Sequence, residues 1–214
     1  MKGTVSRVTE TATGVRKRRG PRGEYAKSSA TREAILDAAL EVFASGYNSG
    51  SLRDIATRVG MSEAGLLHHF KSKSVLLQAV LDLRDERSRE LVDLESEDGA
   101  ESLRGLVTLA RYNASVPGVV ELYCTLSAEA TAPEHPAHDY FKRRYETVRA
   151  SLGETFARLI ADGRLLPGVS PERAAVATIA MMDGLQVQWL LDRDVVDMGD
   201  ALQEFFDGLI IGGI

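Results

Sequence analysis

Two adjacent histidines, His68 and His69, are the residues with the clearest chemical potential, and they lie in the stretch MSEAGLLHHFKSKSVLL. The chain has only four histidines, so half of them are here. Neighbouring helical residues point about 100° apart, which argues against one metal ion shared by both rings. General-base catalysis would need a nucleophile or carboxylate partner in a cleft, and the spacing offers none. We therefore predict no metal site and no catalytic site, and no cofactor.

The charge of the chain is unevenly distributed. The net charge is −5 over 214 residues, but residues 1–73 hold 13 Lys and Arg against 7 Asp and Glu, whereas the remainder is strongly acidic. A basic N-terminal part on an acidic body suggests a polyanionic partner, and a basic tail without a partner is the alternative. A single cysteine, Cys124, excludes a disulfide framework and a cysteine-rich zinc site. The absence of an apolar signal segment, and of an apolar run near the roughly 18 residues of a membrane span, favours a cytoplasmic protein that does not engage membranes.

The apolar periodicity predicts an all-α fold. Residues 1–27, which contain RKRRGPRG, show no such periodicity and are predicted to be a flexible basic arm. Ser29 or Thr31 can begin a first helix that ends at Gly46. Further helices are expected at about 51–59, 62–70, 72–95, 101–115, 118–131, 137–162, 171–193 and 198–211. We predict about nine helices, in a small module at 28–73 followed by a larger helical domain at 74–214.

Residues 51–70 have the spacing of a helix-turn-helix unit, in which a short helix, a turn with glycine and a second helix follow one another. The second helix of such a unit enters the DNA major groove with its N-terminal residues at the base edges. Ser62 can cap that helix and bind a phosphate, while Glu63, Ala64 and Gly65 are short enough for close approach. Phe70 is expected to point inward and hold the unit together.

The run from Thr31 to Leu77 resembles the DNA-binding domain of TetR-family bacterial regulators. The resemblance rests on REAILDAALEVFASGY, SLRDIATRVGMS and LLHHFKSKSVLL, with the glycines and the closing F-K-S-K in register. It implies an Ω-shaped, all-helical homodimer that binds a palindromic operator on double-stranded DNA and releases it when a small molecule enters the C-terminal domain. The sequence departs from the family pattern at Leu67, where the family usually has a DNA-contacting tyrosine.

The resemblance and the helix-turn-helix geometry together assign a set of DNA contacts. Phosphate contact through ring N–H groups is the favoured role of His68 and His69, with a structural role for one of them as the alternative. Lys73 matches a lysine that the family places on the phosphate backbone. Weaker candidates are Ser51 and Arg53 at the start of the first helix of the unit. Leu67 can keep apolar contact with a thymine methyl group but lacks the hydroxyl group.

Two further sets of residues are predicted in the C-terminal domain. A mixture of aromatic, soft apolar and polar groups suits a ligand pocket between helices, although a plain helical core is the alternative. This set is Tyr123, Phe141, Tyr145, Met181, Met182, Gln186 and Trp189. The last two helices carry more apolar surface than one domain can easily bury, so an intermolecular four-helix bundle is expected. Its predicted interface is Val176, Ile179, Val187, Leu190, Leu202, Phe205, Phe206 and Leu209.

The sequence thus predicts a bacterial transcriptional regulator, in the cytoplasm and at the nucleoid when bound to DNA, that acts as a repressor released by an effector. The alternative is a nonspecific or architectural DNA-binding protein, which would share the basic N-terminal part but would not need a pocket. A helical enzyme is disfavoured because the chain lacks a glycine-rich phosphate loop and a nucleophile elbow.

Overall fold

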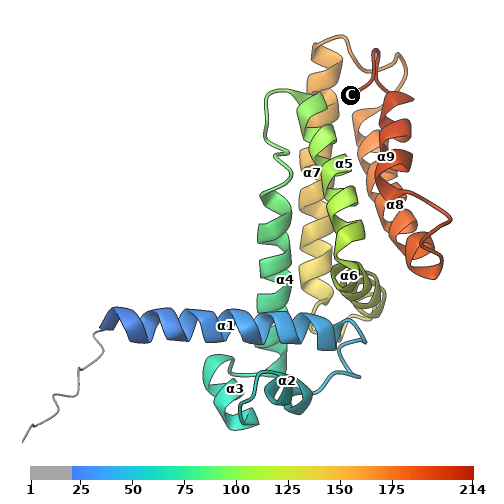
Figure 1. The fold of residues 1–214 in the computed structure, drawn as a ribbon. Coiled ribbons are helices and arrows are strands. Elements are labelled where there is room, and N and C mark those ends of the chain that lie inside the picture. Colours follow the sequence, from blue (N-terminus) through green and yellow to red (C-terminus); the bar gives the residue numbers. More distant parts are fainter. Residues whose placement is uncertain (1–20) are drawn as a thin grey trace, which may run out of the picture.

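The computed structural model describes residues 21–214, which form nine α-helices and no β-strand. Figure 1 shows α1 lying across one end of an elongated helical body, with α2 and α3 beyond it and α4 leading into the body. The helices are α1 (Pro21–Phe43), α2 (Leu52–Arg58), α3 (Glu63–His69), α4 (Lys73–Arg89), α5 (Gly99–Ser115), α6 (Pro117–Glu129), α7 (His138–Ala161), α8 (Pro171–Leu191) and α9 (Met198–Asp207). The predicted all-α architecture is confirmed.

The first helix begins earlier than the sequence predicts. It starts at Pro21, so neither Ser29 nor Thr31 is its cap, and its first residues overlap the part assigned to the basic arm. Proline suits the first turn of a helix because its fixed φ is already helical and its missing N–H would have no intrahelical acceptor. The RKRRG segment, residues 16–20, lies outside the described residues.

Each helix of the helix-turn-helix unit begins at a serine cap, and the predicted cap at Ser62 is confirmed. The Ser51 hydroxyl oxygen accepts the N–H of Asp54 at 3.1 Å, and the Ser62 hydroxyl oxygen accepts the N–H of Gly65 at 3.1 Å. Gly60, between the two helices, has φ +69°, a conformation that side chains disfavour. Local hydrogen bonds and one glycine therefore fix the angle at which α3 leaves α2.

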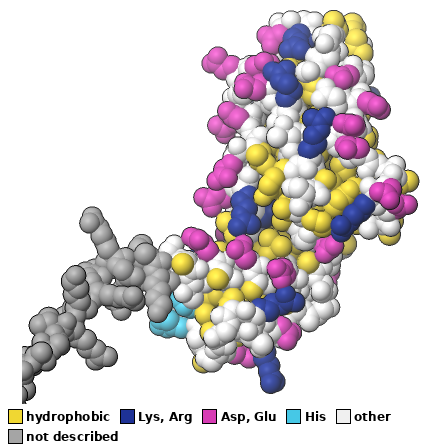
Figure 2. Space-filling model, viewed as in Figure 1, with side chains coloured by type: hydrophobic (Ala, Val, Ile, Leu, Met, Phe, Trp, Pro, Cys, Tyr) yellow, Lys and Arg dark blue, Asp and Glu magenta, His cyan; other side chains and the backbone are white. Residues whose placement is uncertain are grey.

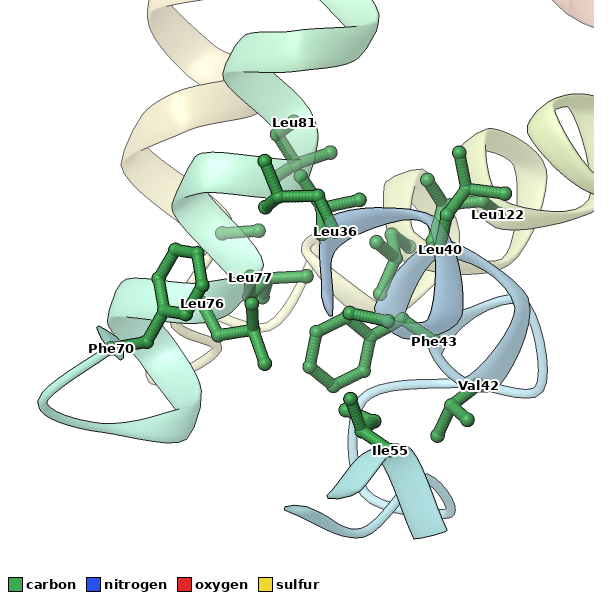
Figure 3. Packing of buried hydrophobic residues seen from close by; sticks show 14 of the residues in the cluster. Leu36, Leu40, Val42, Phe43, Ile55, Phe70, Leu76, Leu77, Leu81 and Leu122 are labelled. Carbon is green, nitrogen blue, oxygen red and sulfur yellow. The ribbon is translucent and has the colours of Figure 1, made fainter. Parts of the chain in front are cut away.

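A hydrophobic core joins the N-terminal module to the lower part of the body. Figure 3 shows side chains of α1, α2 and α4 meeting, among them Phe43, Ile55 and Leu76, with Leu122 of α6 at the same cluster. All four are fully buried. Burial of such side chains contributes roughly 1.5–3 kcal/mol each. The module at 28–73 thus shares a core with α6, so a shift of α6 would be felt by α1.

A second core fills the far part of the body and includes residues of α5, α7, α8 and α9. Phe156 of α7 and Phe206 of α9 lie at its centre, with ring centroids 6.5 Å apart. Leu202 and Phe206 are fully buried within the protomer, which corrects their prediction as interface residues. The periodicity identified α9 as amphipathic, but it could not decide that this face packs on α5 and α7 of the same chain.

Among the described residues, α8 is one helix whose length and composition would let it cross a membrane, contrary to the expectation from the sequence. About 33% of its apolar window is buried inside the protein. Leu185 and Trp189 pack in the second core, whereas Val176, Val187 and Leu191 are exposed. Helix α8 is therefore a packed helix of the body with an additional apolar face. Figure 2 shows that hydrophobic side chains are also exposed among charged ones on the visible face of the body.

Candidate nucleic-acid interface and ligand cavity

The predicted base-reading residues lie together on an exposed part of α3. Ser62, Glu63 and Ala64 are exposed at its first turn, and Gly65 is half-buried. A side chain at Gly65 would place its Cβ 3.3 Å from the Ser62 oxygen, so glycine leaves the cap undisturbed. The Ser62 hydroxyl uses an acceptor lone pair for this cap and keeps its proton for donation. The start of α3 can thus approach a nucleic acid closely with its backbone.

The next residues of α3 present a mixed surface. Leu67 is 37% exposed, His68 is exposed and His69 is half-buried, while Phe70 is almost fully buried as predicted. The two imidazole rings lie nearly perpendicular, at 79°, with centroids 6.0 Å apart. Within residues 21–214, no group of three or more His, Cys, Asp and Glu side chains is placed to hold a metal ion. The paired histidines can donate separate hydrogen bonds from one helix end.

Lys73 and the two candidates on α2 lie close to α3 in the fold. Ser51 caps α2 and Arg53 is exposed on its first turn. Lys73 is the first residue of α4, and its Nζ lies 4.4 Å from the centre of the Tyr47 ring. Burial lowers the pKa of Lys73, and the negative charge of Glu129 opposes that shift. The ring holds the lysine by a cation–π contact at the edge of the surface that carries α3.

A contact that the sequence does not predict connects this surface to α6. The backbone N–H of Tyr47 donates to Oε2 of Glu129 at 2.9 Å, and Nε2 of His135 lies 3.3 Å from the same oxygen. The Nδ1 atom of His135 accepts the N–H of Ala137, so the ring nitrogen facing Glu129 is the one that carries a proton. Gly46 makes room, because a Cβ there would lie 2.5 Å from Glu129 Oε1. We call Tyr47, Lys73, Glu129 and His135 the α6 clamp.

A cavity of about 920 Å³ lies in the body between α4, α5, α6, α7 and α8. This volume falls within the range of small-molecule sites. One part of its wall is aliphatic, with Leu106, Leu109, Leu152 and Ile179. The wall also carries Tyr123, Tyr140 and Tyr145, and its charged side chains include Arg84, Asp85, Arg144 and Asp183. The cavity therefore suits an amphipathic molecule.

The charged part of the wall is held by short contacts. Asp85 Oδ1 accepts from both Arg84 and Arg144, so one carboxylate on α4 serves two guanidinium groups. Arg84 also lies over the Tyr123 ring, 4.2 Å from its centre. The Tyr145 hydroxyl donates to Asp183 Oδ2 at 2.8 Å, and burial raises the pKa of Tyr145, which keeps the phenol protonated. These contacts link α4, α6, α7 and α8 around one cavity.

Four of the predicted pocket residues line this cavity, namely Tyr123, Tyr145, Met182 and Gln186. The other three do not. Phe141 packs in the first core between Tyr123 and Tyr140, and Met181 and Trp189 belong to the second core. Aromatic and sulfur side chains at helical spacing fit a core as well as a pocket, and only the packing separates the two.

The residues predicted for a dimer interface, apart from the buried Leu202 and Phe206, lie in three different environments. Val176 and Val187 are about half exposed on α8, in line with Leu191 at 83% exposure. Leu190, Phe205 and Leu209 are partly buried against the second core. Ile179 lines the cavity instead. The outer face of α8 is thus an apolar stripe that the protomer does not cover.

Two family models match the chain in separate regions. Residues 35–80 match the model described as "Bacterial regulatory proteins, tetR family", and residues 119–210 match the one described as "BetI-type transcriptional repressor, C-terminal". The first covers α2, α3, the C-terminal part of α1 and the N-terminal half of α4, and the second covers most of α6 and all of α7, α8 and α9. The match therefore includes both the candidate nucleic-acid interface and most of the cavity wall.

Comparison with individual proteins extends the similarity over most of the chain. The transcriptional regulator UidR of Escherichia coli (strain K12) is 38% identical over 188 residues, which cover 86% of this chain and 92% of UidR. TtgR of Pseudomonas putida is 28% identical over 193 residues, 83% of this chain and 88% of TtgR. The crystal structure of NalD from Pseudomonas aeruginosa, described as the secondary repressor of the MexAB-OprM multidrug efflux pump, has a TM-score of 0.64 at 26% identity, covering 86% of this chain and 98% of NalD.

Proposed function

The chain belongs to the TetR family of bacterial regulatory proteins, and from this premise we propose that it is a repressor that leaves its operator when a small molecule occupies the α4–α8 cavity. Transcriptional regulators of this family bind DNA operators as dimers and respond to small-molecule effectors. The observation that supports the proposal for this chain is the position of α4. Its first residue, Lys73, is part of the proposed nucleic-acid interface, and Arg84 and Asp85 lie in the cavity wall.

Helix α3 is the proposed recognition helix. We propose that its capped first turn, in which Ser62, Glu63 and Ala64 are exposed, enters a major groove. We assign phosphate contacts to Ser51, Arg53, His68, His69 and Lys73, and an apolar contact with a thymine methyl group to Leu67. In this arrangement the histidines add hydrogen bonds at the C-terminal end of α3, where Leu67 has no hydroxyl group to offer.

Coupling between the two sites follows from the stiffness of α4. The helix spans 17 residues without a proline, which corresponds to roughly 25 Å. A ligand can move this helix only if it binds one position of α4 more tightly than the other. Asp85 is the natural point of such discrimination, since its carboxylate ties α4 to Arg144 of α7. The shared core and the α6 clamp carry the same movement to α1 and Tyr47.

We propose that the protein acts as a homodimer through the exposed stripe of α8. Val176, Val187 and Leu191 recur at spacings of eleven and four residues, which places them on one face of the helix. A two-fold symmetric pair of recognition helices predicts a near-palindromic operator. We expect the dimer in the bacterial cytoplasm, and at the nucleoid when it is bound to DNA.

The proposal is tested with the full-length protein on DNA. Random-site selection followed by footprinting on the region upstream of its own gene should yield a protected inverted repeat. A nonspecific or architectural protein would instead show a specific-to-nonspecific affinity ratio near one at fixed salt concentration, against about a thousandfold or more for a regulator. A flat footprint together with no selected consensus sequence would refute the proposed function.

A further inference from the structure

In the part of the chain that the structure describes, some charged side chains of the cavity wall form ion pairs with each other, whereas Asp183 does not. Arg84 and Arg144 both engage Asp85, and the side chain of Arg84 is only 6% exposed. Asp183 also lies in the wall and is partly buried, but no Lys, Arg or His nitrogen of the described residues lies within 4.0 Å of its carboxylate. Within residues 21–214, its carboxylate accepts a hydrogen bond from the neutral hydroxyl of Tyr145 at 2.8 Å. A carboxylate withdrawn from water without a cation is costly, so Asp183 is the group that a ligand can satisfy.

We propose that the effector is an amphipathic organic cation, whose ammonium group binds Asp183 and whose apolar body packs against the aliphatic side chains of the cavity wall. This inference rests on the proposed function and names the chemical class of its ligand. An anionic head group would have to compete with Asp85 for Arg84 and Arg144, and among the described residues only the buried Nε of Arg84 is left without a partner on these two side chains for it to contact. In the whole cavity wall, five carboxylates stand against four guanidinium groups.

The surroundings of Asp183 fit this ligand class. Tyr145 fixes the orientation of the carboxylate from α7, while Met182, Ile179 and Gln186 on α8 line the cavity beside it. Phenol rings attract cations through their faces, and Tyr145 and Tyr140 lie in the same wall. Burial raises the pKa of Asp183, although the Tyr145 hydrogen bond and the charges of Arg84 and Arg144 oppose the shift. A bound cation would relieve this penalty directly.

A cationic ligand also gives a reason for α4 to change position when the ligand binds. Arg84 of α4 is close enough to Asp183 for its positive charge to lower the pKa of that carboxylate. A ligand cation at Asp183 places a further positive charge beside Arg84. The two positive charges repel each other, and both are attracted to the Asp183 carboxylate. Arg84 is then less favourable in its present position, and the helix that carries it also carries Lys73 of the nucleic-acid interface.

The experiment uses three probes with the same skeleton, a terminal diphenyl group on a butyl chain that ends in an amine, an alcohol or a carboxylate. Their affinities for the full-length protein are measured by calorimetry. We expect the amine to bind about tenfold or more tightly than the alcohol, since a hydrogen bond to a charged group exceeds a neutral one by this order, and the carboxylate to bind most weakly. Asp183→Asn should abolish the preference for the amine over the alcohol.

A matched control is Asp82→Asn, which removes the same charge from the exposed rim of the cavity and should keep the preference for the amine. Tyr145→Phe, which removes the hydroxyl that orients Asp183, should reduce amine affinity by a smaller factor. Tightest binding by the carboxylate, no binding of the amine, or an amine preference that survives in Asp183→Asn would overturn the proposal. Operator binding is measured separately. If only the carboxylate probe releases a specific operator, the proposed ligand class is refuted but the proposed function is supported. If the protein shows no sequence-specific DNA binding at all, the proposed function itself is refuted.

Discussion

Replacing Glu129 with alanine should uncouple α6 from the nucleic-acid interface. Its Oε2 atom accepts the N–H of Tyr47 at 2.9 Å, its side chain is 30% exposed, and Nε2 of His135 lies 3.3 Å from it. Hydrogen bonds to charged groups contribute about 1.5–3 kcal/mol, and removal of the acceptor leaves the Tyr47 N–H without a partner. Because the site is partly solvated, we expect a loss near the lower end, about 2 kcal/mol in the free energy of unfolding.

This loss corresponds to a fall of roughly 4–8 °C in the midpoint of thermal unfolding for a chain of this length. Glu129→Gln keeps an oxygen acceptor but not the charge, so about half of that fall is expected. Operator affinity, followed by fluorescence anisotropy, should decrease in the same order, since Tyr47 and Lys73 lose their support from α6. Calorimetric unfolding of the variants supplies the first measurement.

Glu134→Ala is the matched control, because Glu134 is an exposed carboxylate in the segment that follows α6. It removes the same charge without touching Tyr47. The reasoning would be refuted if Glu129→Ala unfolded at the same temperature as Glu134→Ala and bound the operator equally well. That outcome would mean that the shared hydrophobic core alone positions the N-terminal module, and that the α6 clamp contributes nothing to it.

Four further substitutions test separate parts of the structure. Lys73→Ala should weaken binding to all DNA sequences alike and reduce the salt-dependence slope by about one per protomer; a changed base preference would contradict a phosphate contact. Leu67→Ala should reduce specific affinity while leaving nonspecific affinity unchanged in the same titrations. Val187→Arg should convert the dimer to monomer in analytical ultracentrifugation, and an unchanged mass would exclude the α8 interface. Asp183→Asn should raise the unfolding temperature at neutral pH, because the raised pKa of Asp183 makes its ionised form unfavourable in the folded state; this advantage should shrink as the pH falls through that pKa.

The helix-turn-helix unit was predictable because its determinants are local in sequence. Ser51 and Ser62 cap helices through hydrogen bonds that span three residues, and Gly60 turns the chain between them. The start of α1 was missed for the converse reason. The residues from Pro21 onward have no apolar periodicity, so their helical state extends a helix that is stabilised by the packing of Ile35 and Phe43 further along.

Tertiary packing determines whether an apolar residue lies in a core, in a pocket or at an interface, and the sequence left this open for several residues. Leu202 and Phe206 have the spacing of an interface stripe, but they pack inside the protomer beside Phe156. Trp189 and Phe141 are of residue types that are common in ligand pockets. Phe141 instead packs in the first core and Trp189 in the second. A 3.6-residue period says that one face of a helix is buried, and it does not say by which neighbour. The partner of each face depends on contacts between helices far apart in the chain.

Most of the charged residues of the cavity wall could not be predicted from the sequence, because the helices that carry them are rich in charged residues. Arg84, Asp85 and Arg144 lie on long helices rich in Arg, Asp and Glu, where such residues are ordinarily solvated. Asp183 alone carried a signal, since it interrupts the apolar run AMMDGLQVQWLL. A carboxylate in that setting must either reach water or be compensated, and the fold leaves it in the wall of a cavity with a neutral partner. A carboxylate that lacks an ion-pair partner within residues 21–214, and whose pKa is raised by burial, is suited to bind a group of the opposite charge.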